Sequence, residues 1–273
     1  MAMSVNTNTA ALTALQNLSM TTNELSTTQK RISTGLKVSS TKDDSASYTI
    51  AQTLRGDVGK LASVGSSLSR AKSTVDVAVA GTQQISDLVN QMAAKATSAS
   101  DAGLDTNSRD AMAKDFDALK EQIQSIIDSS SFNGTNLLKG DGGSVSALQS
   151  TDTTAATLDV DNQDFGTDVI DAIGTTFTDA DSAKTMIDTL KDVSETINTS
   201  LSTLGSASRK IDGQASFVNS LSDVITSGIG NLVDADLSKE SANLQALQVK
   251  QQLGVQALSI ANQAPQSITS PFR

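Results

Sequence analysis

Residues 190–225 read LKDVSETINTSLSTLGSASRKIDGQASFVNSLSDVI, and they carry the clearest structural signal in the chain. Every seventh position holds an aliphatic residue: Leu190, Ile197, Leu204, Ile211, Val218 and Ile225. This repeat is typical of a helix that packs along its length against other helices. Such a helix would extend about 54 Å, since each residue adds about 1.5 Å. The stretch therefore predicts a long, rod-like helix.

A second seven-residue repeat precedes it and predicts another long helix. Its members are Leu54, Leu61, Leu68 and Val75, and the pattern continues through Thr82 to Val89. Gly56, Gly59 and Gly65 interrupt this helix. Each glycine inside a helix costs about 1 kcal/mol relative to alanine, so either the helix bends there or another backbone packs close. We expect close packing.

Between these repeats lie a shorter helix and a region of different composition. Residues 106–129 carry apolar residues at helical spacing: Met112, Phe116, Leu119, Ile123 and Ile126. Residues 133–178 are instead rich in Gly, Thr, Asp and Ser, with turn signals at Asn133-Gly134 and Gly142-Gly143. The stretches 145–148 and 157–160 are expected to pair as a β-hairpin.

Both ends of the chain predict helices that lack partners of their own. Residues 8–33 hold a short apolar seam, and residues 236–264 are apolar on several sides, with Val249, Leu253, Val255 and Ile260 lying off the main stripe. A helix of this kind must be covered on several sides. We expect Asp234 or Asp236 to cap the last helix, the two terminal helices to pair, and neighbouring chains to cover the rest.

The composition excludes many classes of function. The 273 residues carry a net charge of −10 and contain no His and no Cys. Zinc sites with Cys or His ligands, disulfides and His-dependent catalytic units are therefore excluded. The acidic loop from Asp159 does not match a calcium-binding EF-hand, because Asp164 stands at the glycine position and Ile170 at the final glutamate position. No catalytic, metal or cofactor site is expected, and a Ser/Lys hydrolase stays a remote alternative.

Charge and hydropathy predict neither a nucleic acid nor a membrane as partner. A sequence pI near 4.4 opposes binding to phosphates and anionic lipid surfaces. No apolar run approaches the roughly 18 residues of a membrane span. The first basic residue is Lys30, so the beginning also lacks the charged start of a secretory signal peptide. On these signals alone we expect a soluble protein that stays in the cytoplasm.

The two ends of the sequence resemble those of bacterial flagellins. At the N-terminal end the similar motifs are NTN at 6–8, ALQNL at 14–18, QKRISTGLKV at 29–38 and KDD at 42–44. Near the C-terminal end they are DAD at 234–236, QQLG at 251–254, ANQAPQS at 261–267 and the closing Phe272-Arg273. SFNG at 131–134 looks like the turn after the third flagellin helix. The short length and the ending are similar to alphaproteobacterial flagellins.

The resemblance implies a mainly α fold, in which long antiparallel helices form a bundle or coiled coil beside a small β-hairpin and the terminal helices pair. Residues 1–45 and 234–273 would form a discontinuous inner-core coiled-coil domain. Residues 46–233 would form an outer-tube helical domain with a small β or loop region at about 133–178. The large outer domains found in many flagellins would be absent.

The function implied is that of a structural subunit of the flagellar filament, which self-assembles into a helical tube and is not an enzyme. The resemblance also replaces the cytoplasmic expectation by an extracellular one, with export through the flagellar type III channel and no cleaved signal peptide. Expected partners are further copies of the chain, the flagellar cap and hook-filament junction proteins, and an export chaperone. No cofactor, nucleic acid or membrane is implied. A hook-filament junction protein and a helical signalling or adaptor rod are the alternatives.

Two sets of residues are expected to carry the assembly. Polar residues at the connection between inner and outer tubes could set the register of subunits: Arg31, Lys42, Asp43 and Asp44. Apolar residues of the terminal helices should form the subunit interface of the inner tube: Leu15, Leu18, Leu25, Ile32, Leu244, Leu247, Leu258 and Ile268.

Overall fold

The computed structural model describes residues 7–152 and 156–269, and the side chains of the last helix as far as Gln263. Its contacts divide the chain into two compact units: Met1–Gly56 with Val224–Arg273, and Asp57–Asp223. Long helices dominate both units, and the only sheet in the described residues has two antiparallel strands. The predicted mainly α class with a small hairpin is therefore confirmed.

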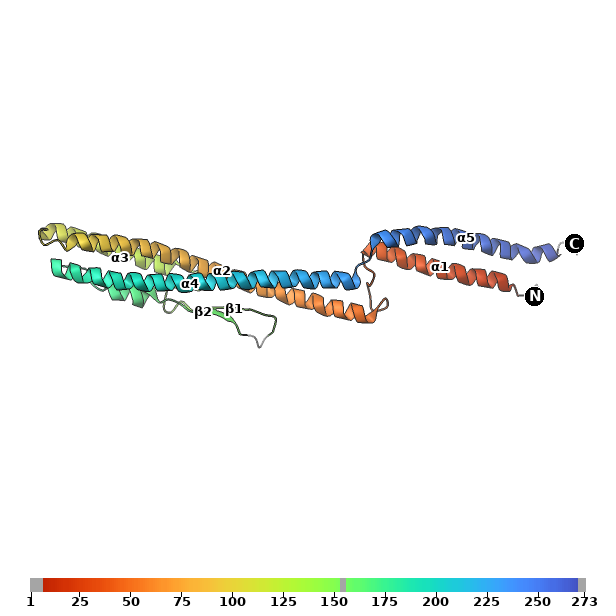
Figure 1. Cartoon of the computed structure of the whole chain (residues 1–273), viewed down its shortest axis with the longest axis horizontal. Coiled ribbons are helices and arrows are strands. Elements are labelled where there is room, and N and C mark those ends of the chain that lie inside the picture. Colours follow the sequence, from red (N-terminus) through yellow and green to blue (C-terminus); the bar gives the residue numbers. More distant parts are fainter. Residues whose placement is uncertain (1–6, 153–155, 270–273) are drawn as a thin grey trace. The chain divides into compact units, whose positions relative to one another are not determined.

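The first unit contains two antiparallel helices, α1 (Thr9–Thr34) and α5 (Leu237–Thr269), which lie side by side (Figure 1). Asn8 caps α1 by accepting a hydrogen bond from the backbone N–H of Ala11. Its Nδ2 also donates to the carbonyl of Ala261 on α5 over 2.7 Å. Gly35, at φ 71°, ends α1 in a left-handed conformation that glycine adopts without strain. Both terminal helices thus form where their apolar patterns predicted them.

The chain segments that follow α1 and precede α5 are joined by backbone hydrogen bonds. Leu36 and Asp234 form an isolated antiparallel bridge. The N–H groups of Lys37 and Val38 donate to the carbonyl of Val233. Asp236, one of the two predicted caps, accepts from the first N–H groups of α5. This pairing fixes the point at which the chain enters and leaves the terminal helix pair.

The second unit is built around α3 (Thr106–Ser129) and most of α2 (Ser45–Ala99) and α4 (Ala180–Val233). Lys72 of α2 contacts Asp212 of α4 over 2.9 Å, and Ser208 donates to Asp76, so α2 and α4 run antiparallel. Phe116 of α3 packs edge to face on Phe177, with 5.3 Å between ring centroids. The buried core includes five members of the α4 repeat, each at most 3% exposed: Leu190, Ile197, Leu204, Ile211 and Val218.

The predicted hairpin is confirmed and lies in the second unit. Strand β1 (Val145–Ala147) pairs antiparallel with β2 (Leu158–Val160), with Val145 opposite Val160. Val145, Ala147 and Val160 are buried, whereas Ser146 and Asp159 point to solvent, as the two-residue period of a strand requires. A short π-helix, η1 (Gly166–Asp171), follows and buries Val169. No pattern in the sequence predicted this π-helix.

The expectation of close backbone packing at the α2 glycines is wrong. A Cβ added at Gly56, Gly59 or Gly65 would meet open space. The tight glycines lie elsewhere: a Cβ at Gly142 would overlap the carbonyl of Asn136, and one at Gly81 would press on Ser130 and Leu138. A glycine in a helix shows only that a side chain is missing, and the sequence does not show what lies opposite.

Candidate assembly site

The α1–α5 pair brings together six of the eight predicted interface residues. Leu247 is buried, and five are half-buried: Leu18, Leu25, Ile32, Leu244 and Leu258. Their spacings, seven residues on α1 and three and eleven on α5, fit the seam of a coiled coil, so they shield one another within a single chain. A Cβ at Gly254 would lie 3.2 Å from Cδ1 of Leu18, which shows that the two helices approach closely there. No pattern in the sequence indicated this role of Gly254.

The other two predicted interface residues do not join this seam in the described structure. Leu15 is 52% exposed, so it faces away from α5. Ile268 lies beyond Gln263, among the residues whose side chains are not described. Their role as interface residues therefore stays a prediction.

The outward surface of the α1–α5 pair is unusually apolar. Side chains that are 49% to 69% exposed occur on both helices: Leu12, Leu15, Met20, Leu237, Val249, Leu253, Val255 and Ile260. Thr28 is the only described residue of α1 that is buried, and Glu240 and Leu247 are the only ones of α5. We call the eight exposed apolar residues the outer apolar set. A helix pair that buries so little and exposes so many large apolar side chains is typical of a surface that binds a partner.

An ion pair links α1 to α5 next to the chain connections. Nη1 of Arg31 lies 3.2 Å from Oε1 of Glu240, and the side chain of Glu240 is only 10% exposed. The second carboxylate oxygen, Oε2, is buried and has no hydrogen-bond partner among the described residues. Arg31 therefore links α1 to α5 through Glu240, a partner that the sequence did not identify, and its expected role in setting the register of subunits stays a prediction.

Asp43 closes the turn before α2. Its Oδ2 accepts hydrogen bonds from the backbone N–H and the hydroxyl of both Ser39 and Ser40, and Nζ of Lys30 lies 3.5 Å away. The bonds from Ser39, first from its backbone N–H and then from its hydroxyl, lower the pKa of Asp43 to about 2. The carboxylate is thus ionised at neutral pH and acts as a structural anchor.

The remaining connector residues have simpler environments. Asp44 caps α2 by accepting from Ala46 and Ser47, and the hydrogen bond from the Ser47 hydroxyl is the largest cause of its lowered pKa. Lys42 is exposed on the same turn. The structure therefore assigns Arg31 to the helix pair and Asp43 and Asp44 to the turn that starts α2.

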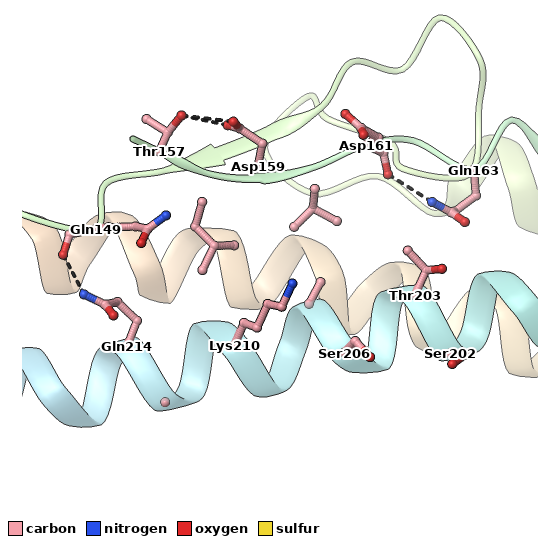
Figure 2. Close-up of a pocket in the computed structure, with 14 residues that line it drawn as sticks. Gln149, Thr157, Asp159, Asp161, Gln163, Ser202, Thr203, Ser206, Lys210 and Gln214 are labelled. Atoms are coloured by element: carbon pink, nitrogen blue, oxygen red, sulfur yellow. Dashed lines mark hydrogen bonds between the residues drawn. The ribbon is translucent and has the colours of Figure 1, made fainter. Parts of the chain in front are cut away.

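A groove in the second unit lies between the hairpin and α4 (Figure 2). Its volume is about 800 Å³, and Lys210 projects into it from α4. Nε2 of Gln214 donates to the carbonyl of Gln149 over 2.6 Å and holds the hairpin loop against α4. Hydrogen bonds from Ser146 and then Thr157 lower the pKa of Asp159, which lies across from Lys210. The groove is polar, and its contacts fix the hairpin on the helix.

Residues 7–152 and 156–269 contain no group of three or more Asp or Glu side chains that could hold a metal ion. Within the same ranges no helix is long and apolar enough to cross a membrane.

Two family models match the chain and together cover most of it. The model of the bacterial flagellin N-terminal helical region matches residues 5–142. The model of the bacterial flagellin C-terminal helical region matches residues 185–272. The unmatched stretch between them contains β1, β2 and η1.

Individual proteins are similar over nearly the whole chain. Flagellin FljM of Caulobacter vibrioides is 45% identical over 270 residues, which cover 99% of this chain and 98% of that protein. A flagellin of Brucella melitensis is 36% identical over 281 residues, which cover 99% of each chain. The crystal structure of Bacillus cereus flagellin has a TM-score of 0.51 and 24% identity, over 55% of this chain and 86% of that one. The last comparison shows likeness of fold alone.

Proposed function

The chain belongs to the bacterial flagellin family and is a structural subunit of the extracellular flagellar filament, and from this premise we propose that its α1–α5 pair forms the inner wall of the tube. In this proposal residues 1–45 and 234–273 form the inner-core domain. Residues 46–233 form the outer tube around it, with the β region at about 133–178 on its flank.

The outer apolar set is the observation that carries the proposal. Its members are 49% to 69% exposed in the single chain, and their burial between copies would stabilise the polymer through the hydrophobic effect. They occupy faces of α1 and α5 away from the intrachain seam, so each copy can contact several neighbours. The six seam residues would hold the pair together, while the outer apolar set, which includes Leu15, would join the copies.

Ordering of the terminal helices would then be coupled to polymerisation. The α1–α5 pair buries few residues by itself, so little free energy is available to offset the conformational entropy that its helices lose on folding. Contacts with neighbouring copies would supply the missing burial. Subunits would therefore add at the end of an existing filament more readily than they would nucleate a new one.

The second unit supports the proposed role of an outer wall because it has a core of its own. Phe116, Phe165 and Phe177 are fully buried, and five members of the α4 repeat are at most 3% exposed. Between α3 and α4, the residues that the structure describes form only a small hairpin and a short π-helix. A filament built from this chain would accordingly be thin and fairly smooth.

The connector would set the register of subunits. Arg31 joins α1 to α5 through Glu240, and Asp43 anchors the turn that starts α2. Rigid contacts at this point would fix how the inner wall continues into the outer tube. Lys42 and Asp44 lie on the same turn, and Lys42 is free to approach a neighbouring copy.

Export and partners follow from the same surfaces. We expect the chain to leave the cell unfolded through the flagellar type III channel without a cleaved signal peptide, and the absence of cysteine suits this route. A chaperone would cover the apolar faces of α5 until export. The flagellar cap and the hook-filament junction proteins would contact the ends of the filament. Activity would arise from packing between copies, with no catalytic group.

Seeded polymerisation tests this proposal. Purified chain is mixed with sheared filament seeds and compared with a variant that lacks residues 236–273, and both are viewed by negative-stain microscopy. We expect long uniform tubes from the intact chain and none from the truncated one. Circular dichroism of the truncated chain serves as the control, since its second unit should stay helical. Tubes from the truncated chain, or only rings from the intact one, would contradict the proposal.

A further inference from the structure

A polar groove runs along one side of the α1–α5 pair, within the first unit. Its volume is about 520 Å³. Nearly all the side chains that line it are polar or charged: Asn23, Glu24, Thr27, Thr28, Arg31, Glu240, Asn243 and Lys250, with Ala246 and Leu247 as the exceptions. The groove therefore interrupts a surface that is otherwise distinguished by exposed apolar side chains.

Glu240, which lines this groove, has one carboxylate oxygen without a hydrogen-bond donor among the described residues. Its Oε1 accepts from Arg31, whereas Oε2 is buried and has no partner among the described residues. A buried carboxylate oxygen without a donor destabilises the state that contains it, and a donor from outside the chain would remove that penalty. The side chain is only 10% exposed, so a donor that reached it would be shielded from water.

The charges around Glu240 favour a neutral donor over a lysine or arginine. Arg31 already compensates the charge of the carboxylate at 3.2 Å. Lys250 lines the same groove and balances the charge of Glu24, so a further cation would have to be stripped of water without an uncompensated anion to pair with, which is costly. An amide N–H satisfies Oε2 at a smaller desolvation cost.

A row of exposed glutamines on α5 offers such amides. We call Gln245, Gln248, Gln252 and Gln256 the glutamine row, and all four are exposed. At about 100° per residue they share one face of α5, with members of the outer apolar set on both sides. The row is therefore continuous with the surface proposed to join copies.

The groove and the row lie on different sides of α5. Asn243 and Lys250 line the groove, and helical geometry places the glutamine row on the far side of α5 from them. A copy that used its row to fill another copy's groove would keep its own groove free. Contacts between two different patches of one molecule generate a ring where the rotation between copies closes and an open helical filament where it does not. This arrangement suits a filament.

We propose that in the filament a carboxamide of the glutamine row of a second copy enters the α1–α5 groove and donates a hydrogen bond to Oε2 of Glu240. This inference rests on the proposed role of the α1–α5 pair in assembly and names one contact of that assembly. Apolar contacts are not directional, whereas a hydrogen bond is. The contact would therefore help to fix the register in which one copy packs on the next.

Exchanging the two partner groups tests the contact. Each glutamine of the row is changed to glutamate, one at a time, in the full-length chain and in a chain that also carries Glu240→Gln. Critical concentrations are measured in seeded polymerisation. At the contacting position the single Gln→Glu change should raise the critical concentration about 10-fold or more, because two carboxylates would meet. Adding Glu240→Gln should restore it to within about two-fold, since the amide and carboxylate have then traded places.

Two further results keep the test specific. Glu24→Gln, in the same groove, serves as the matched control and should neither weaken assembly nor rescue any member of the row. If Glu240→Gln rescues none of the four positions while the wild-type chain forms tubes, the contact is refuted and the filament role stands. If the wild-type chain forms no tubes, the proposed function itself fails.

Discussion

Replacing Leu253 and Ile260 by glutamine should weaken filament assembly without disturbing the helix that carries them. Both residues belong to the outer apolar set, at 57% and 69% exposure in the single chain. Glutamine has a helix propensity close to that of leucine and better than that of isoleucine, so α5 should keep its intrinsic stability. The change therefore removes apolar surface and little else.

The size of the effect follows from the exposed fractions. Complete burial of a leucine or isoleucine side chain contributes about 1.5–3 kcal/mol. Burying the exposed 57% of Leu253 and 69% of Ile260 would contribute about 1–2 kcal/mol each. The double variant should lose about 2–4 kcal/mol per subunit added, which raises the critical concentration about 30- to 1,000-fold.

The assay is seeded polymerisation at a series of subunit concentrations, with the unpolymerised chain measured after sedimentation. Ser259→Gln is the matched control, because it also places glutamine at an exposed position of α5 but removes no apolar side chain. We expect the control to polymerise as the wild type does. A critical concentration within about three-fold of wild type for the double variant would refute the reasoning, because these side chains would then not be buried between copies.

Four further predictions concern contacts within the single chain. Gly59→Ala should stabilise the second unit by about 1 kcal/mol, because its Cβ would meet open space in a helix. Gly142→Ala should destabilise the same unit by about 1–3 kcal/mol, because its Cβ would overlap the Asn136 carbonyl. Urea unfolding measures the free energy of unfolding of both variants. Arg31→Met should weaken α1–α5 pairing by about 1–3 kcal/mol. The loss should be smaller than for a fully buried ion pair, because Arg31 is 34% exposed. Polymerisation assays should show that adding Glu240→Met recovers part of the loss. The Asp43 turn should be stable above pH 4 and open as the pH falls towards 2, because the pKa of Asp43 in the folded chain, about 2, lies below the ordinary value of 3.8. NMR shifts of the Ser39 and Ser40 amides measure this opening. Asp43→Asn should abolish the transition.

The sequence predicted the long helices and the hairpin because both rest on local periodicity. Five members of the seven-residue repeat from Leu190 lie in a continuous core. In the hairpin, the two-residue alternation buries Val145 and Val160, which pair with each other. The π-helix at Gly166–Asp171 has no comparable periodic signal, so it was missed.

The candidate site was only partly predictable, because its contacts join residues far apart in the chain. Arg31 was singled out, but its partner Glu240 lies 209 residues away and carries no motif that connects the two. Gly254 was noticed only as part of a resemblance, and its contact with Leu18 depends on the antiparallel register of α1 and α5. The glycines of α2 were misjudged for the same reason, since packing partners are set by the tertiary fold.

The most direct test of the account is a helical reconstruction by cryo-electron microscopy of filaments grown from the purified chain. The account predicts a tube in which α1 and α5 lie at the smallest radius, with Leu253 and Ile260 buried between copies. A reconstruction with α1 and α5 on the outside of the tube, or with those side chains facing solvent, would contradict it.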